Sequence, residues 1–139
     1  MSHISKINVE IKALEILKAA CQRLGYQFVP NQCKYKWYGV NMGDYPLPEG
    51  LKASDLGKCT HAIKVPGADY EVGVVQQGNK YTLLYDFWPT GGLTGVGDKL
   101  AQAYAVEAAR TEAQRQGYSV WEEILQDDSV QLHIEVQEG

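Results

Sequence analysis

A glycine-rich segment over 89–97, placed before a helical pattern, is the first group of residues with a chemical possibility. Amides at a helix start bind phosphate, and the spacing of these glycines resembles a phosphate-binding loop. Asp98, however, separates Gly97 from Lys99, and Leu100 stands where a magnesium-binding hydroxyl should follow. A carboxylate at the helix cap would also repel phosphate and occupy the amides. We therefore interpret 89–97 as a flexible connection and expect no nucleotide.

A second group contains thiols and imidazoles. Cys33, Cys59 and His61, with His3 or His133, could be combined into a zinc site, which needs three or four N or S ligands. There is no C-x-x-C pair, and Cys33 precedes Cys59 by 26 residues. Buried free cysteine often serves as a small apolar residue. These three residues remain weak metal candidates, and we expect no metal or other cofactor.

Nucleophilic catalysis would need Ser or Cys beside His and an orienting acid. All these residue types occur, but none lies in a recognisable signature. The acid pairs 122–123 and 127–128 lie near a turn, where solvated side chains are the expected state. No residue set supports a mechanism, so we name no catalytic residue and do not expect an enzyme.

Aromatic side chains form the third and most informative group. In the strand predicted over 80–88, Leu84, Asp86 and Trp88 share the face opposite Leu83. Aromatic residues of segment 35–38 could join them or cover a sheet edge. Exposed apolar surface often marks a partner site, and Tyr and Trp are frequent in interface hot spots. The candidate partner-binding residues are Tyr35, Trp37, Tyr38, Asp86, Trp88 and, from the polar face of the last strand, His133.

These aromatic residues allow several functions. The first is an accessory protein that binds a protein partner or a second copy of itself through an aromatic sheet face. The alternative is a single-stranded RNA-binding module of ferredoxin-like type, in which aromatic side chains stack on bases. The net charge of −4 and Glu135 on the polar face disfavour RNA, because phosphates need basic neutralisation. A small enzyme of unrecognised class, or aromatic residues that are simply core, are further alternatives.

Two helices and several strands must position these side chains. Apolar spacing predicts helices over 13–24 and 99–116, with Gly25 and Gly117 at their ends and Asp98 as the cap of the second. Strands are expected over 4–11, 26–29, 60–65, 70–76, 80–88, 118–121 and 130–137, with a long loop over 41–57 and a tight turn at 77–79. In the last strand, apolar and polar residues alternate, which predicts one core face and one wet face.

The fold class follows from this order. The helix exit at 22–29 resembles that at 114–121, since both read helix end, glycine, tyrosine, strand. We predict an α+β fold with a ferredoxin-like antiparallel sheet, made of two β-α-β units with inserted strands and two helices packed on one face. The 139 residues are expected to form one domain over 1–139.

Charge is distributed unevenly along the chain. Residues 1–36 carry six Lys or Arg against two acids, whereas 122–139 carry six acids and no Lys or Arg. We expect the two ends to meet and neutralise each other. Neither a signal peptide nor a membrane-spanning run is predicted. Three cysteines without framework spacing favour reduced thiols, so we expect a cytoplasmic protein or one in an equivalent compartment such as the plastid stroma.

Several short motifs carry a family resemblance across nearly the whole chain. They are Ser2-His3-Ile4-Ser5 with Leu14-Glu15-x-Leu17-Lys18-Ala19, then Tyr70-Glu71-Val72-Gly73, Tyr81-x-Leu83-x-x-Asp86-Phe87-Trp88, Gln116-Gly117-Tyr118-Ser119-Val120, and Val130-x-Leu132-x-Ile134. In this order they resemble the uncharacterised hypothetical chloroplast open reading frame thirty-five family, a domain of unknown function found in chloroplasts, cyanobacteria, other bacteria and phages. Segment 89–97 departs from its pattern. The resemblance implies a cytoplasmic or stromal protein and no catalytic residues.

Overall fold

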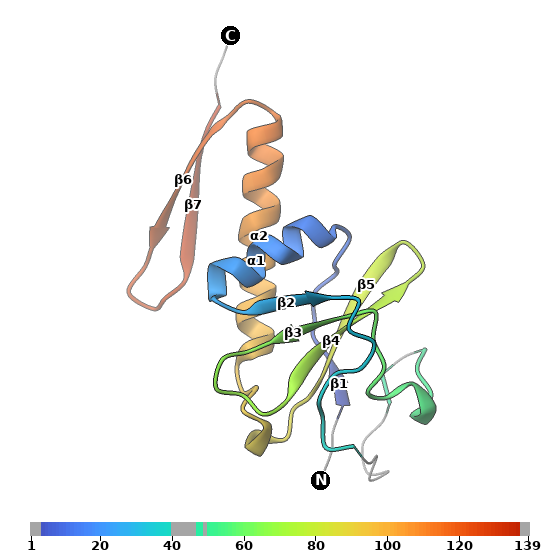
Figure 1. Cartoon of the computed structure of the whole chain (residues 1–139). Coiled ribbons are helices and arrows are strands. Elements are labelled where there is room, and N and C mark those ends of the chain that lie inside the picture. Colours follow the sequence, from blue (N-terminus) through green and yellow to red (C-terminus); the bar gives the residue numbers. More distant parts are fainter. Residues whose placement is uncertain (1–3, 40–46, 49, 137–139) are drawn as a thin grey trace.

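An antiparallel five-stranded sheet with two helices on one face forms the body of the protein, and a separate hairpin extends from it (Figure 1). The computed structural model describes residues 4–39, 47–48 and 50–136. The main sheet contains β1 (Ile4–Lys6), β2 (Gln27–Pro30), β3 (His61–Lys64), β4 (Glu71–Gln77) and β5 (Lys80–Asp86). The helices are α1 (Leu14–Leu24) and α2 (Val96–Arg115), and the hairpin is β6 (Ser119–Ile124) with β7 (Val130–Glu135).

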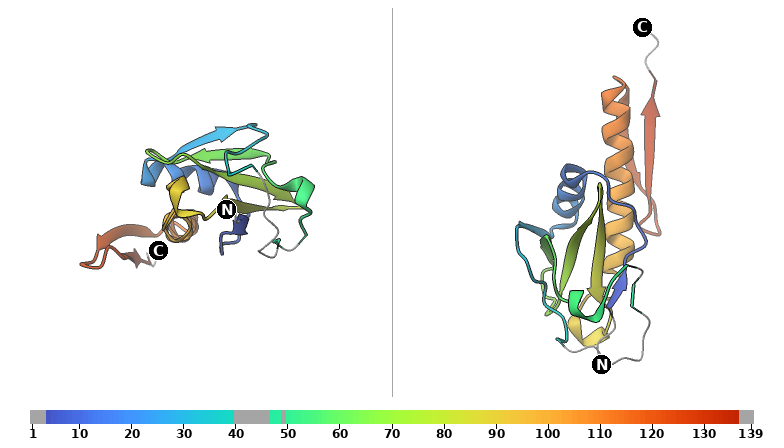
Figure 2. Two further views of the ribbon diagram at one scale, coloured as in Figure 1. Left: turned by 90° about the horizontal axis from the view of Figure 1, so that it is seen from below. Right: turned by 90° about the vertical axis from the view of Figure 1, so that its right-hand side faces the viewer.

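The strand order confirms the α+β class, whereas the predicted ferredoxin-like arrangement of two β-α-β units is not confirmed. The order is β1-β5-β4-β3-β2 with every neighbouring pair antiparallel, so β1 and β2 run in the same direction at opposite edges and are joined by α1. The prediction of a second unit, in which α2 would lead to a strand of the same sheet, was wrong. In the described structure, β6 pairs only with β7. The 20 residues of α2 span about 30 Å, which carries the chain beyond the sheet (Figure 2).

The helices cover the sheet face that carries Leu83. The core here contains Ile63 and Val74 of the sheet, Leu17 of α1 and Leu100 of α2, all fully buried. The Tyr104 hydroxyl on α2 accepts hydrogen bonds from the backbone N–H groups of Lys12 and Ala13, at 3.1 and 3.3 Å. This contact ties the start of α1 to α2 and completes a single helical layer.

The long segment between β2 and β3 covers part of the opposite sheet face. Tyr35 and Leu56 from this segment are buried against Leu84 of β5, and Trp37 and Leu51 pack around them. A short helical turn, Ala53–Asp55, lies in the same segment. The predicted loop over 41–57 falls partly outside the described residues, at 41–46 and 49. The second face of the sheet therefore carries its own small core.

Several predicted element boundaries change in the structure. The first strand is shorter than expected, although Ile11 still bridges to Tyr81. Helix α2 begins at Val96 after Gly95, so Asp98 lies in the first turn and is not the cap. Burial of Val96 and the approach of Gly97 to Ile7 account for this earlier start. These are tertiary contacts, and capping preferences, which depend only on the local sequence, cannot predict them.

Candidate protein-binding surface

The predicted aromatic face is largely covered by the chain itself. Tyr35 is buried, and Trp37 and Trp88 are half-buried. Tyr38, at 49% exposure, is the most open of the candidate aromatics. Asp86 is completely buried beside them. The structure therefore brings together five of the six candidate residues, but around a small core in which little aromatic surface is open.

Two buried carboxylates of the sheet hold the segment after β2 in place. Asp86 Oδ2 accepts the backbone N–H of Tyr38 at 3.1 Å. Glu71 Oε1 accepts the backbone N–H of Lys36 at 2.9 Å, and the Glu71 N–H donates to the Lys36 carbonyl oxygen at 2.9 Å. Buried carboxylates need such partners to offset their desolvation. Asp86 is thus a positioning residue for the covering segment, a role that its place among aromatics did not suggest.

Close packing at one glycine further fixes this cover. The Tyr35 ring lies directly over Gly73 of β4, where an added Cβ would sit 2.3 Å from Cδ1 of the ring. Burial raises the pKa of the Tyr35 hydroxyl to about 12, so the phenol stays neutral at physiological pH. Only glycine leaves room here for the aromatic ring.

We expect Gly73→Ala to lower the free energy of unfolding by about 1.5 kcal/mol, since overpacking a filled site costs roughly 1–3 kcal/mol. In a Tyr35→Ala background, the same substitution should cost much less, because the ring that it would displace is gone. Urea denaturation of the four proteins in this double-mutant cycle measures the coupling. An equal cost in both backgrounds would show that the ring and the glycine do not interact.

His133, the sixth candidate, lies on the hairpin, far from the others in the chain's topology. Its ring stacks on Trp121 across the two strands, with the ring centroids 5.1 Å apart and the planes 8° apart. The same strand face carries Glu123 and Glu135, whereas Val120, Glu122 and Ile124 lie on the opposite face. The hairpin therefore has a polar face with one aromatic pair and a mainly apolar face.

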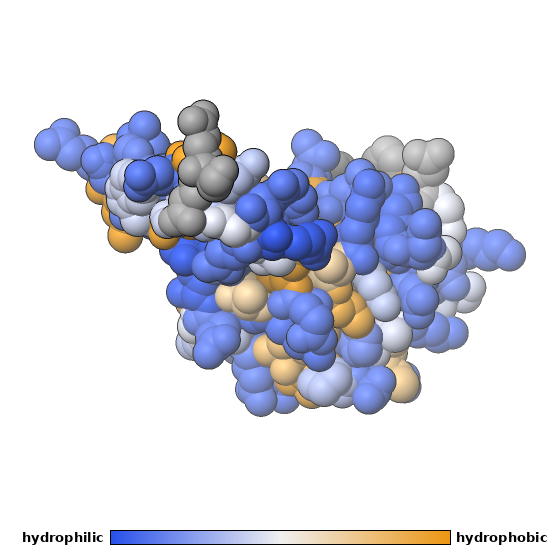
Figure 3. Space-filling view, turned by 90° about the horizontal axis from the view of Figure 1, so that it is seen from above, coloured by the Kyte–Doolittle hydropathy of each residue, from blue (hydrophilic) through white to orange (hydrophobic). Residues whose placement is uncertain are grey.

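The apolar face of the hairpin is incompletely covered. Helix α2 packs along it, yet Ile124 remains 73% exposed and Val136 58% exposed. The prediction that one face of the last strand belongs to the core is thus only half correct, because Ile134 and Val136 are exposed. Figure 3 shows hydrophobic side chains in orange among polar ones on the lobe that the hairpin forms at the left. The exposed apolar residues of both hairpin faces and of the turn, which we call the arm residues, are Trp121 on the polar face together with Ile124, Leu125, Ile134 and Val136.

An ionic cluster attaches the hairpin to the helices. Glu122 accepts two hydrogen bonds from the Arg23 guanidinium, at 2.6 and 2.5 Å, and further bonds from Arg110. Arg23 also donates to Glu107 at 3.0 Å. Hydrogen bonding to Arg23 is the main cause that lowers the pKa of Glu122 to about 2. Of the basic and acidic chain ends that were expected to meet, Arg23 and Glu122 do so, and α1, α2 and β6 are joined there.

Neither predicted acid pair forms a carboxylate dyad. Glu122 and Glu123 lie on opposite strand faces. Asp127 accepts hydrogen bonds from the backbone and hydroxyl of Ser129, at 3.1 and 2.5 Å, and these bonds lower the pKa of its carboxyl. Asp127 and Asp128 therefore belong to the hairpin turn, where they add negative charge beside Leu125.

The weak metal candidates lie near one another without forming a cluster of ligands. Cys59 is half-buried and Cys33 exposed, and His61 Nδ1 accepts the backbone N–H of Asn31 at 2.9 Å. Among the described residues, no group of three or more His, Cys, Asp or Glu side chains is placed to hold a metal ion. His3 lies outside the described residues, and His133 belongs to the hairpin.

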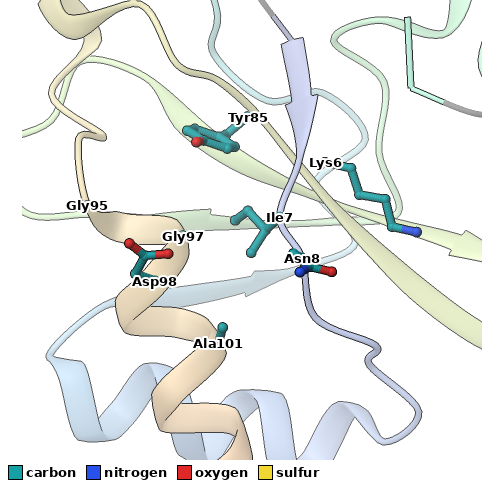
Figure 4. A pocket seen from close by; sticks show the side chains of 8 residues that line it. All are labelled: Lys6, Ile7, Asn8, Tyr85, Gly95, Gly97, Asp98 and Ala101. Atoms are coloured by element: carbon teal, nitrogen blue, oxygen red, sulfur yellow. The ribbon is translucent and has the colours of Figure 1, made fainter. Parts of the chain in front are cut away.

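The glycine-rich connection borders a hollow of about 320 Å³ between β1, β5 and the start of α2 (Figure 4). Its lining includes Lys6, Tyr85, Asp98 and the backbone of Gly95. Figure 4 shows the Lys6 side chain pointing away from Asp98, so the two charges do not converge on one point. The Asp98 carboxylate lies in the first turn of α2, where its negative charge repels a phosphate. We therefore assign no ligand to this hollow.

A comparison with protein-family models decides the family. The model described as "Protein of unknown function (DUF1257)" matches residues 49–133, more than half of the chain. The chain belongs to the DUF1257 family. The prediction of an uncharacterised family is thereby confirmed. No curated protein and no solved structure matches the chain.

The DUF1257 match has a structural meaning. It runs from residue 49, within the covering segment, through β3, β4, β5, α2 and nearly all of the hairpin. The arm residues lie within it, except Ile134 and Val136 at its end. In the part of the chain that the structure describes, neither helix combines the length and apolar composition needed to cross a membrane.

Proposed function

We propose that this DUF1257 protein is an accessory protein that binds a partner protein through the hairpin β6–β7, and that the partner presents basic and apolar side chains. The observation that carries the proposal is the exposure of the arm residues on a hairpin outside the main sheet. An interface core of apolar and aromatic residues within a polar rim is typical of protein–protein recognition. Trp121, half exposed on the hairpin face opposite Ile124 and Ile134, is the aromatic anchor that we assign to the polar face.

The strand edges support this proposal. In the described structure, β6 and β7 pair only with each other, so each leaves one edge of N–H and C=O groups without a neighbouring strand. Such edges accept an added strand from a partner, while side chains on alternate positions provide specificity. An isolated two-stranded hairpin is marginally stable in water. A third strand supplied by a partner would therefore bind the hairpin β6–β7 and also stabilise it.

Charge selects the kind of partner. Residues 119–136 contain five acids and no Lys or Arg. Glu122 is neutralised by Arg23 and Arg110, which leaves the acids of the turn and of the polar face to act on a partner. Two such hairpins side by side would repel each other, whereas a basic surface would be attracted. The same acids oppose the phosphates of RNA.

The sheet face that the sequence favoured is a poorer choice for binding. Tyr35 and Leu56 already cover it, and a partner would have to displace contacts that hold Asp86 and Glu71. We also propose an intracellular compartment, because Cys21, Cys33 and Cys59 are all free thiols. An RNA-binding module and a small enzyme remain less supported alternatives.

Three short strand-forming peptides, in which valine alternates with lysine, glutamate or serine, test the proposal. We expect the labelled valine–lysine peptide to bind with micromolar Kd by fluorescence anisotropy and to weaken as salt rises, because salt screens exposed charges. Trp121→Ala or Ile124→Ser should weaken this binding by about tenfold. The acidic and neutral peptides should bind far less.

Tyr38→Ala is the matched control, since Tyr38 is similarly exposed but lies on the body of the protein. Equal loss of binding in this variant would refute the assignment to the hairpin. Light scattering provides a second test, in which we expect a monomer. A wild-type dimer that becomes monomeric after Ile124→Ser would instead identify a second copy as the occupant of the hairpin.

A further inference from the structure

We propose that Cys33 and Cys59 form a redox modification site, at which thiol–disulfide exchange with a small disulfide of the glutathione type creates a Cys33–Cys59 bond. The site lies where the segment between β2 and β3 leaves and returns to the body of the protein. It is independent of the hairpin and of the binding function proposed for it.

The backbone places the two cysteines opposite each other. Lys34 and Lys58 form an antiparallel bridge, flanked by hydrogen bonds from Tyr35 N–H to Gly57 O at 3.0 Å and from Cys59 N–H to Cys33 O at 2.9 Å. Cys33 and Cys59 are thus cross-strand neighbours that share one hydrogen bond, and fully hydrogen-bonded antiparallel pairs have Cα atoms about 5.5 Å apart with side chains on the same face. Disulfides span Cα separations of about 4.4–6.8 Å. Bond formation therefore needs little movement of the backbone.

The thiol hydrogen bonds support the same placement. Cys59 Sγ donates to the carbonyl oxygen of Gln32 at 3.0 Å, and Cys33 Sγ lies 3.6 Å from the carbonyl oxygen of Asn31. Both sulfur atoms thus lie beside the same short stretch of chain, residues 31–33. The third thiol, Cys21, is buried in the helical core.

Accessibility sets the order of the reaction. Cys33 is exposed, whereas burial raises the pKa of the half-buried Cys59 to about 11. The Cys33 thiolate attacks one sulfur of the small disulfide, whose S–S bond breaks and releases one thiolate. Cys59 then loses its proton to water and attacks Cys33 Sγ, and the second small thiol leaves. Two protein thiols are oxidised to one disulfide, while one small disulfide is reduced to two thiols.

The bond would close a loop around the covering segment. The residues between the two cysteines include Tyr35 and Leu56, which lie buried on the second sheet face. Cross-linking the ends of a segment restricts the unfolded chain and stabilises the folded one. The oxidised protein should therefore melt several degrees higher than the reduced protein.

Incubation of the folded protein with oxidised glutathione, followed by alkylation and mass spectrometry, tests the site. We expect the protein to lose the mass of two hydrogen atoms and to yield a Cys33–Cys59 linked peptide. Cys21, whose pKa burial raises to about 12, should become alkylated only after unfolding and serves as an internal control for the folded state. Cys59→Ser should stop at a glutathione adduct on Cys33, and Cys33→Ser should react much more slowly.

Three results would overturn the proposal. They are a stable glutathione adduct on wild-type Cys33 with Cys59 still open to alkylation, no reaction of either thiol, and a disulfide formed between two molecules. Peptide binding by the oxidised protein is measured in a separate experiment. If the hairpin does not bind the valine–lysine peptide, the test of the Cys33–Cys59 disulfide is therefore unaffected.

Discussion

Replacing Asp86 with alanine should lower the free energy of unfolding by about 4 kcal/mol, the largest effect that we expect from a single substitution. The Asp86 carboxylate is completely buried and accepts the backbone N–H groups of Tyr38 and Trp88, at 3.1 and 3.0 Å. Loss of the carboxylate leaves buried donors without their acceptor, and breaking a buried charged network commonly costs 3–5 kcal/mol. The segment that covers the second sheet face should also loosen.

Urea denaturation monitored by tryptophan fluorescence measures this loss, because Trp37 packs in the affected core and the Trp88 N–H donates to Asp86. Asp86→Asn keeps one acceptor oxygen and should lose less. Asp69→Ala, at an exposed position, is the matched control and should change stability by under about 0.5 kcal/mol. If Asp86→Ala were as stable as this control, the carboxylate would not be holding the segment.

Glu122→Gln should lower the free energy of unfolding by about 2.5 kcal/mol at pH 7, because it removes the charge shared by Arg23 and Arg110. The pKa of Glu122 is about 2 in the folded protein, below its usual value of 4.5. A lowered carboxyl pKa contributes stability above pH 4.5 that is lost as the pH falls towards 2. The variant should therefore lose less stability than the wild type over that range.

Denaturation curves at a series of pH values between 7 and 2 provide the measurement. Glu123→Gln is the matched control, since Glu123 is the next residue on β6 and its side chain is half exposed on the other face. We expect this control to keep the wild-type pH dependence. Parallel pH profiles for Glu122→Gln and the wild type would contradict the assigned role of the cluster.

Hydrogen exchange of β6 and β7 would separate local from global effects of Glu122→Gln. The two strands contact the rest of the protein mainly through α2 and this cluster. Regions that open locally exchange faster than the core. If exchange in Glu122→Gln became faster only in the hairpin, this would show that the ionic cluster serves to position the arm residues.

Local chemistry accounts for the parts of the fold that were predicted correctly. Gly25 ends α1 with φ at 75° and donates its N–H to the carbonyl oxygens of Cys21 and Gln22, as a glycine cap should. Gly78 and Asn79 separate β4 from β5, where a tight turn was expected. These features depend on residues close in the chain, so a short stretch of sequence is sufficient to predict them.

The errors in the predicted site have a different origin. Alternation correctly placed Val130, Leu132 and Ile134 on one strand face, but Ile134 and the following Val136 remain exposed. It also placed Leu84 and Asp86 on one face, which proved to be buried. Periodicity indicates which side chains share a face, but it does not predict which other segments cover that face. Cover depends on contacts between segments far apart in the chain.

By itself, then, the sequence determined the α+β class, the two helices with their glycine ends, the strand faces and the uncharacterised family. Only the tertiary structure decided that the segment after β2 covers the aromatic face, and that the last two strands leave the sheet. The physical reason is that α2 extends past the sheet before the chain turns, and Arg23 and Arg110 then capture Glu122 on the helical layer. The exposed hairpin is the consequence of these long-range contacts.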